Sequence, residues 1–153
     1  MASFTPAQVN AYLEARAAEL FDPARRLRIT FDEEFRVSIP ASGGVYAFFH
    51  GNQLFYVGET TSLRQRLAIH MRNPENHVLA LKIARRLHDR IHGEGAAGSQ
   101  KKFAEDHKGS MRRWVADNLQ VAFVPLLIGR KELEERLCAQ HAPMFNDRYP
   151  VLP

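Results

Sequence analysis

The chain has 153 residues, of which 45% are hydrophobic and 25% charged, and a formal net charge of +4. This length and composition are typical of one folded globular domain and argue against a disordered chain. The single cysteine, Cys138, excludes a disulfide framework and a zinc site built from several thiolates.

The positive charge is concentrated in the middle third of the chain, residues 62–113, which we name the basic segment. It carries 12 Lys and Arg against 5 Asp and Glu, whereas residues 1–61 sum to −2 and residues 114–153 to −1. Clustered cations favour binding to a polyanion, because binding releases the counterions condensed on it. The same charges could instead form a solvated face on surface helices, and the charge alone leaves both interpretations open.

Neither a signal peptide nor a membrane span is predicted. Residues 2–21 contain Glu14, Arg16 and Glu19 where a signal peptide has its apolar run. No stretch reaches the roughly 18 uninterrupted apolar residues that a membrane helix needs. Together with the single cysteine, these features predict a cytoplasmic protein that does not act in a membrane.

The first predicted element is an amphipathic helix. Thr5-Pro6 is typical of a helix start, and apolar residues recur at helical spacing as far as Asp22-Pro23. Residues 27–39 contain extended-looking pieces. We therefore interpret residues 1–42 as an N-terminal extension packed on a core domain formed by residues 43–153.

A β-hairpin opens the predicted core domain. Gly44–Phe49 and Leu54–Gly58 are rich in strand-forming residues. Ser62–Gln65 has the pattern of a capping box, which predicts a helix that ends at Asn73-Pro74. The expected fold is α+β, with a small three-stranded antiparallel sheet flanked by helices and a helical extension at the N-terminus. The remaining predicted elements are helices over residues 76–92, 100–117 and 131–141, a glycine-rich loop over 93–99 and a strand over 119–124.

Two tripeptides in the hairpin resemble a known signature. Gly44-Val45-Tyr46, followed ten residues on by Tyr56-Val57-Gly58, is similar to the paired motif of the GIY-YIG nuclease superfamily. Arg66 lies ten residues after Tyr56 and His70 four further on, in the helix that the family pattern places after the hairpin. These joint spacings make the resemblance more specific than the tripeptides alone.

The C-terminal part of the chain extends the resemblance. Glu134 precedes Asn146 by twelve residues, as the acidic metal ligand of the family precedes its terminal Pro-x-aromatic-Asn. This spacing favours Glu134 over Glu132 and Glu135 as the ligand. The resemblance spans residues 44–146 and is weakest over 76–118.

The resemblance implies an endonuclease that depends on Mg²⁺ or Mn²⁺ and leaves a 5′-phosphate and a 3′-hydroxyl. Glu134 would hold the metal ion, since oxygen ligands and several retained waters suit these cations. Arg66 would grip the scissile phosphate with a planar, permanently charged fork. His70 lies four residues after Arg66 and would share its helix face, so both could reach one phosphate.

The two tyrosines would act on the attacking water. By resemblance, Tyr46 and Tyr56 polarise or deprotonate this water with help from His70, and Asn146 braces the site by hydrogen bonding. An unperturbed tyrosine is a poor base near neutral pH, so its pKa would have to be lowered by Arg66 or the metal. A shared site predicts that Tyr46 lies opposite Tyr56 across a three-residue loop. A two-residue turn would separate their faces unless a bulge intervened.

Cationic side chains of the basic segment are predicted to contact the substrate backbone, because phosphate contacts add affinity without reading the base sequence. The expected substrate is DNA, whether single-stranded, duplex or branched, and cleavage of both strands could use a homodimer. Two alternatives stay open, namely a binding module that keeps the fold without catalysis and a nuclease directed at RNA. The predicted contact residues are Arg64, Arg72, Lys82, Arg85, Arg86, Arg90, Lys101, Lys102, Arg112 and Arg113.

Overall fold

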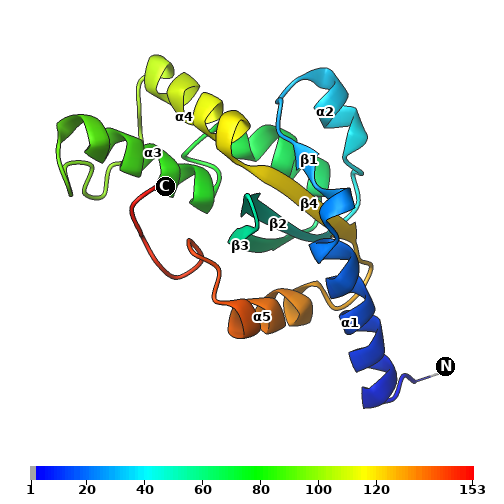
Figure 1. The fold of residues 1–153 in the computed structure, drawn as a ribbon. Helices are drawn as coiled ribbons and strands as arrows, with labels where there is room; N and C mark the ends of the chain where they lie inside the picture. The colour runs from blue at the N-terminus through cyan, green and yellow to red at the C-terminus, as the bar shows by residue number, and fades with distance from the viewer. Residues whose placement is uncertain (1–2) are drawn as a thin grey trace.

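An antiparallel sheet forms the centre of the structure, with helices packed on both of its faces (Figure 1). The structure is a computed structural model in which residues 3–153 are described, so the first two residues of the predicted extension lie outside it. The elements follow in the order α1 (Pro6–Phe21), η1 (Pro23–Arg25), β1 (Leu27–Arg28), α2 (Glu33–Ser38), β2 (Gly44–His50), β3 (Gln53–Thr60), η2 (Gln65–Ile69), η3 (His70–Arg72), α3 (Val78–His92), α4 (Glu105–Asn118), β4 (Gln120–Pro125) and α5 (Arg130–His141).

The strands lie in the order β1-β4-β2-β3, so β4 and β2 are central. The predicted α+β fold, a small antiparallel sheet flanked by helices, is confirmed. The predicted number of three strands is wrong by one, because β1 pairs with β4 through Leu27↔Val121 and Arg28↔Gln120. Two residues carry too short a pattern for a strand to be predicted. They form a strand only because the open edge of β4 offers them backbone hydrogen-bond partners.

The two faces of the sheet have separate hydrophobic cores, because side chains alternate along each strand. On one face, Tyr46, Phe48 and Tyr56 pack with residues of α2, η2, α3 and α4. On the other face, Val45 and Ala47 pack with residues of α1 and α5. The two tyrosines therefore project toward the face that the basic segment covers.

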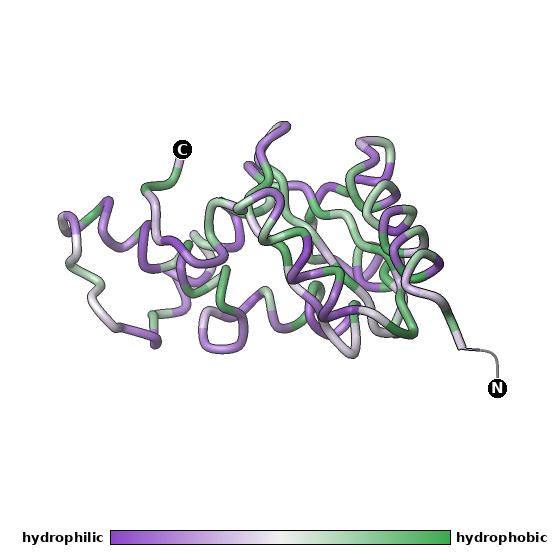
Figure 2. Tube along the Cα trace, turned by 90° about the horizontal axis from the view of Figure 1, so that it is seen from below, coloured by the Kyte–Doolittle hydropathy of each residue, from purple (hydrophilic) through white to green (hydrophobic). Residues whose placement is uncertain are grey.

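The N-terminal helix begins where the sequence predicts. The Thr5 hydroxyl accepts a hydrogen bond from the Gln8 backbone (3.2 Å), and the Gln8 side chain accepts one from the Thr5 backbone (2.8 Å). Hydrophilic and hydrophobic residues alternate along the helices of the molecule (Figure 2). Among residues 3–153, no helix has both the length and the apolar character needed to cross a membrane.

Residues 27–39, for which the sequence predicts extended pieces, form the short strand β1 over Leu27–Arg28 and the helix α2 over Glu33–Ser38. Asp32 caps α2 by accepting a hydrogen bond from the Phe35 backbone (2.8 Å), and Glu33 and Glu34 occupy the first turn. An aspartate followed by acids favours a helix start through capping and the helix dipole. This local signal wins over the apolar residues that suggested strands.

The predicted helix after the hairpin is also different in form. Gln65–Ile69 is a π-helical turn, and His70–Arg72 continues it as a 3₁₀ turn that ends at Asn73. Wide π turns occur mostly as short segments at functional sites. Farther along, α4 begins at Glu105 instead of residue 100, with two acids in its first turn.

The hairpin brings Tyr46 and Tyr56 to one face by means of a bulge. His50 pairs with Gln53 across a two-residue turn, so the predicted three-residue loop is wrong. Phe48 pairs with Tyr56 but Phe49 pairs with Leu54, which leaves one extra residue in β3. The bulge reverses the alternation of β3, and both tyrosines consequently face the same side. Tyr46 itself lies opposite Gly58, not opposite Tyr56.

The Tyr46 ring crosses directly over Gly58. A Cβ atom built on Gly58 would lie 2.3 Å from the Tyr46 hydroxyl oxygen and 2.4 Å from its Cζ. No side chain fits at that separation, so the glycine of the second tripeptide is required by a neighbouring tyrosine. This contact fixes the height of the Tyr46 hydroxyl above the sheet.

We expect Gly58→Ala to destabilise the protein by about 1–3 kcal/mol, because the new methyl group overpacks a buried ring. Gly109→Ala in α4 is the matched control. A Cβ there meets nothing closer than 3.7 Å, and alanine should stabilise a helix by roughly 0.5–1 kcal/mol. Urea unfolding of both variants measures the difference. Equal stabilities for the two variants would contradict the close approach of Tyr46 to Gly58.

Candidate active site

The hydroxyl of Tyr46 is the centre of a buried polar cluster. The Tyr46 side chain is 1% exposed. Its hydroxyl oxygen lies 3.1 Å from Nε2 of His77 and accepts a hydrogen bond from Nε of Arg66 at 3.3 Å. Three segments of the chain, namely β2, η2 and the loop before α3, therefore meet at one oxygen atom.

His77 is held in one orientation by the start of α3. It is 2% exposed, and its Nδ1 accepts a hydrogen bond from the Leu79 backbone at 3.1 Å, in the place of a helix cap. Burial holds the pKa of His77 well below its ordinary value, and the charges of Arg66 and His70 lower it further. A neutral imidazole that accepts at Nδ1 carries its proton on Nε2. His77 thus donates to Tyr46.

Tyr46 keeps its own proton. Burial raises the pKa of Tyr46, and the hydrogen bond and charge of Arg66 oppose this increase without cancelling it. Arg66 therefore acts in the expected direction but does not by itself bring the pKa of Tyr46 below its ordinary value. Lowering of this pKa by a bound metal ion stays a prediction. Both acceptor positions of the neutral phenol receive N–H donors, from Arg66 and from His77. Its O–H must consequently point elsewhere, toward a third group.

Tyr56 lies beside Tyr46 in a stacked arrangement. The ring centroids are 6.3 Å apart and the planes differ by 25°. Burial raises the pKa of Tyr56, and the nearby Tyr46 raises it further. Within residues 3–153 the Tyr56 hydroxyl has no hydrogen-bond partner, unlike that of Tyr46. It is therefore free to bind water or substrate.

Arg66 connects the cluster to the loop before α3. While Nε donates to Tyr46, Nη1 donates to the backbone carbonyl of Asn76 at 2.9 Å. A guanidinium has five N–H groups, so the fixed side chain still has donors for an anion. His70 follows the π turn and is half-buried, and its charge contributes to lowering the pKa of His77.

Glu134 supplies an acidic group from α5, the helix that packs on the other face of the sheet. Its negative charge raises the pKa of both Tyr46 and Tyr56, so it lies within electrostatic range of both rings. The pKa of Glu134 is itself raised, first by burial and then by the charges of Glu59 and Glu135. Among residues 3–153 no Lys or Arg forms a salt bridge with Glu134, whereas Glu59 pairs with Arg130 at 3.1 Å.

These surroundings fit a divalent cation with few protein ligands. A desolvated carboxylate that is repelled by other acids and lacks a basic partner gains most from a cation. In the described part of the chain, no three His, Cys, Asp or Glu side chains form a metal-binding group. Glu134 would accordingly be a single protein ligand, with most coordination positions left to water and phosphate oxygens.

Asn146 fastens the C-terminal segment to the edge of the sheet. Its side chain accepts a hydrogen bond from the Val57 backbone N–H (2.8 Å) and donates one to the Val57 carbonyl (2.7 Å). It also lies 3.4 Å from Sγ of Cys138 on α5. Since Val57 lies between Tyr56 and Gly58, Asn146 completes β3 where the strand carries the site.

Several cations predicted to bind nucleic acid have intramolecular roles instead. Lys82, Arg86 and Arg90 donate to backbone carbonyls of residues 145–153 and hold the C-terminal segment against α3. Arg86 is only 7% exposed, with its guanidinium 3.8 Å from the Tyr149 ring centroid. We therefore remove Arg86 from the nucleic-acid contacts, because a phosphate would have to displace the C-terminal segment to reach it.

The other predicted contacts are more available. Arg64 donates to the carbonyl of Ile39, Arg85 to those of Ser99 and Gln100, and Arg113 to the Ser110 hydroxyl. Lys101 and Lys102 are exposed. Arg72 and Arg112 line a groove beside the site.

His77 is the site residue that the sequence analysis did not identify. It lies in the part of the chain where the family resemblance is weakest, and no fixed spacing links it to Tyr46. The available signal was its position directly before a helical pattern, where Ser, Thr, Asp or Asn is usual. A histidine at that position caps the helix with Nδ1 and leaves Nε2 to hydrogen-bond with Tyr46.

Comparisons with known proteins identify the family of this chain. A family model described as the GIY-YIG catalytic domain matches residues 44–149. No curated protein matches the chain. One similar solved structure is the GIY-YIG N-terminal endonuclease domain of UvrC from Thermotoga maritima, as a tyrosine-to-phenylalanine mutant bound to the catalytic divalent cation. It is 20% identical over 76% of this chain and 99% of that chain, with a TM-score of 0.37.

The same UvrC domain bound to magnesium is also similar, with 20% identity over 75% of this chain and 98% of that chain, and a TM-score of 0.36. These structural likenesses are distant. The family model, by contrast, covers more than half of the chain and includes both tripeptides, Arg66, His70, Glu134 and Asn146. The chain therefore belongs to the GIY-YIG family and carries the catalytic domain of these nucleases.

Proposed function

We propose that this protein is a metal-dependent endonuclease that hydrolyses phosphodiester bonds in DNA. The observation that carries the proposal is the Tyr46 hydroxyl, which Arg66 and His77 orient on the sheet face that also holds the stacked Tyr56. Glu134 acts electrostatically on both tyrosines from α5. Water activation, phosphate binding and cation binding thus have candidate groups within one site.

Each group has a proposed task in the hydrolysis. Arg66 binds the nonbridging oxygens of the scissile phosphate with the N–H donors that Tyr46 and Asn76 do not use. Glu134 holds Mg²⁺ or Mn²⁺, which when bound neutralises the charge that develops on the phosphate and on the leaving oxygen. Asn146 keeps the edge of β3 in place.

Water is oriented by phenols and deprotonated by an imidazole. Tyr46, which keeps its proton, donates its O–H to the attacking water or to a phosphate oxygen, and Tyr56 provides a second hydroxyl. His70 is the proposed proton acceptor, because imidazole is the side chain best suited to take a proton near neutral pH. The water oxygen forms a bond to phosphorus and the bond between phosphorus and the 3′-oxygen breaks, while the leaving 3′-oxygen takes up a proton from bulk water. The products are a 5′-phosphate and a 3′-hydroxyl.

We expect Glu134→Gln to lower the rate of magnesium-dependent nicking by about a hundredfold or more, because an amide binds a dication poorly. Without metal, the variant should be at least as stable as the wild type near neutral pH, since a raised pKa means that the ionised carboxylate destabilises the fold. This difference should vanish as the pH falls through the pKa of Glu134. Plasmid nicking and melting in EDTA at several pH values measure both effects.

The exposed neighbour Glu135 provides the control for that experiment. Glu135→Gln removes the same charge one residue away on α5 and should retain nicking activity. If Glu135→Gln and Glu134→Gln lost activity equally, the assignment of Glu134 as the metal ligand would be wrong.

We expect Arg66→Lys to lower kcat for nicking by roughly a hundredfold, even though the charge is kept. A lysine cannot reach Tyr46, Asn76 and a phosphate together with one ammonium group. Arg28→Lys, at an exposed position on β1, is the matched control and should behave as wild type. A fully active Arg66→Lys variant would show that point charge is sufficient and that the fork geometry is not used.

Burial of neutral His77 should make stability depend on pH. Because its folded pKa is depressed, its contribution is complete above the unfolded value near 6.5. Below that pH His77 is protonated in the unfolded chain but stays neutral in the folded protein. The free energy of unfolding therefore falls by about 1.4 kcal/mol per pH unit until the folded pKa is reached. His77→Asn retains a capping side chain and should remove this dependence. Urea unfolding at pH 7.5, 6.5 and 5.5 tests it, and parallel pH profiles would refute a buried neutral imidazole.

A further inference from the structure

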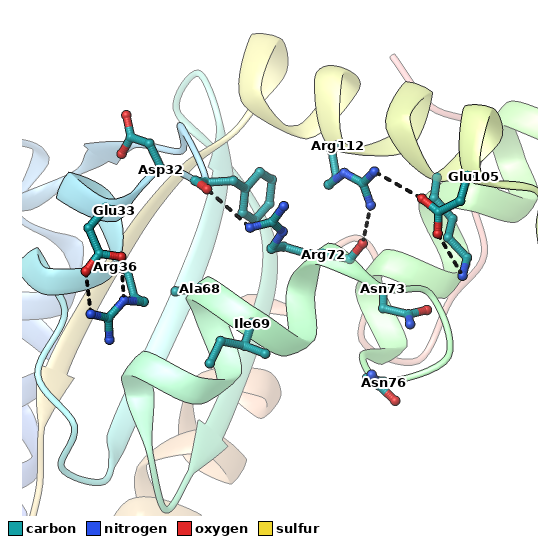
Figure 3. Close-up of a pocket in the computed structure, with 12 residues that line it drawn as sticks. Asp32, Glu33, Arg36, Ala68, Ile69, Arg72, Asn73, Asn76, Glu105 and Arg112 are labelled. Carbon is teal, nitrogen blue, oxygen red and sulfur yellow. Dashed lines mark hydrogen bonds and ion pairs between the residues drawn. The ribbon is translucent and has the colours of Figure 1, made fainter.

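A groove lies between α2 and α4, beside the catalytic face (Figure 3). Its cavity measures about 470 Å³. The floor is formed by η2, η3 and the loop after them, including Ile69, Asn73 and Asn76. The carbonyl of Asn76 accepts a hydrogen bond from Arg66, so the floor of the groove is fastened to the residue that would grip the scissile phosphate.

One wall of the groove is built to hold an anion. Lys108 and Arg112 of α4 flank the carboxylate of Glu105 at 3.7 and 3.6 Å, and the Glu105 side chain is 80% exposed. Arg112 also donates to the carbonyl of Arg72 at 3.1 Å (Figure 3), which brings the Arg72 chain segment against the same wall. These ion pairs are long and their acid is exposed, so a phosphate can replace the Glu105 carboxylate between Lys108 and Arg112.

The floor of the groove suits a nucleobase. Ile69 is 52% exposed there, although it is a large apolar side chain next to the catalytic residues. The side-chain amide N–H groups of Asn73 and Asn76 make no hydrogen bond in the described part of the chain, so they can donate to the edge of a base. An apolar surface flanked by free amides fits a base, whereas a protein side chain would leave the amides unsatisfied.

We infer that this groove holds one unpaired nucleotide adjoining the cut site, with its phosphate at Lys108 and Arg112 and its base over Ile69. The inference rests on the proposed function and specifies its substrate as single-stranded or locally unpaired DNA. The cavity has the size of a small-ligand pocket and admits a base only outside a stack. A paired base would first have to be extruded from the duplex, at a cost of a few kcal/mol.

The test measures binding separately from cleavage. In the Glu134→Gln background without metal, fluorescence anisotropy compares a labelled single-stranded oligonucleotide with its hairpin duplex at several salt concentrations. Ile69→Ala removes most of the apolar surface beneath the base and should weaken single-strand binding about fivefold while leaving duplex binding unchanged. Ile91→Ala, at a position 71% exposed on α3, is the matched control and should bind as the parent does.

Charge variants of α4 should have opposite effects. Arg112→Ala should weaken single-strand binding and reduce the slope of log K against log salt by about 0.7, as expected for one lost phosphate contact. Glu105→Gln should tighten binding severalfold, because the competing carboxylate is gone. Arg28→Ala serves as a control for the loss of one surface cation. Weaker binding on Glu105→Gln, or no change on Ile69→Ala, would overturn the inference.

The outcomes also separate this inference from the proposed function. If the wild type nicks DNA with magnesium but binds duplex and single strand alike, and Ile69→Ala changes neither, the groove assignment fails and the nuclease remains. If the binding pattern is as expected but no DNA is cut with either Mg²⁺ or Mn²⁺, the proposed function fails and the groove is a single-strand binding site.

Discussion

A buried phenol that must be satisfied by hydrogen bonds controls much of this structure. Tyr46 is almost fully buried, and a buried hydroxyl without partners would cost several kcal/mol. Its partners come from two places far apart in the sequence, Arg66 and His77. Each partner is itself fixed by a backbone contact, at Asn76 and Leu79 respectively. The orientation of Tyr46 therefore depends on where α3 begins.

The strand that carries Tyr56 and Gly58 lies at the edge of the sheet, where strands are least constrained. The C-terminal segment compensates for this. Asn146 hydrogen-bonds to Val57 in both directions, and the Phe145 N–H donates to the Phe55 carbonyl at 2.9 Å. Lys82 in turn donates hydrogen bonds to the backbone carbonyls of Phe145 and Asn146. Part of the positive charge of the basic segment thus serves the fold, and only the remainder is available to a substrate.

The features predictable from the sequence are those encoded within a few residues. The cap at Thr5, the hairpin and the joint spacing of the hairpin tyrosines with Arg66 are of this kind, and the family match spans the hairpin and Arg66. The bulge in β3, the strand β1 and the contact of His77 with Tyr46 are not. They depend on tertiary packing, since nothing in the residues around His77 indicates which buried hydroxyl lies above it.

The buried and charged groups of the site lower the stability of the free protein, and under the proposed function bound ligands would offset this cost. Burial and neighbouring acids disfavour the charged form of Glu134, and burial keeps both His77 and Tyr46 neutral. Under the proposed function, a dication at Glu134 relieves the repulsion, and a phosphate at Arg66 completes the charge balance. The neutral His77 and Tyr46 then act as fixed dipoles that need no reorganisation when charge develops on the phosphate. Ligands of this kind stabilise the folded state by mass action, so the groups that make the free protein less stable are also those through which the substrate complex gains stability.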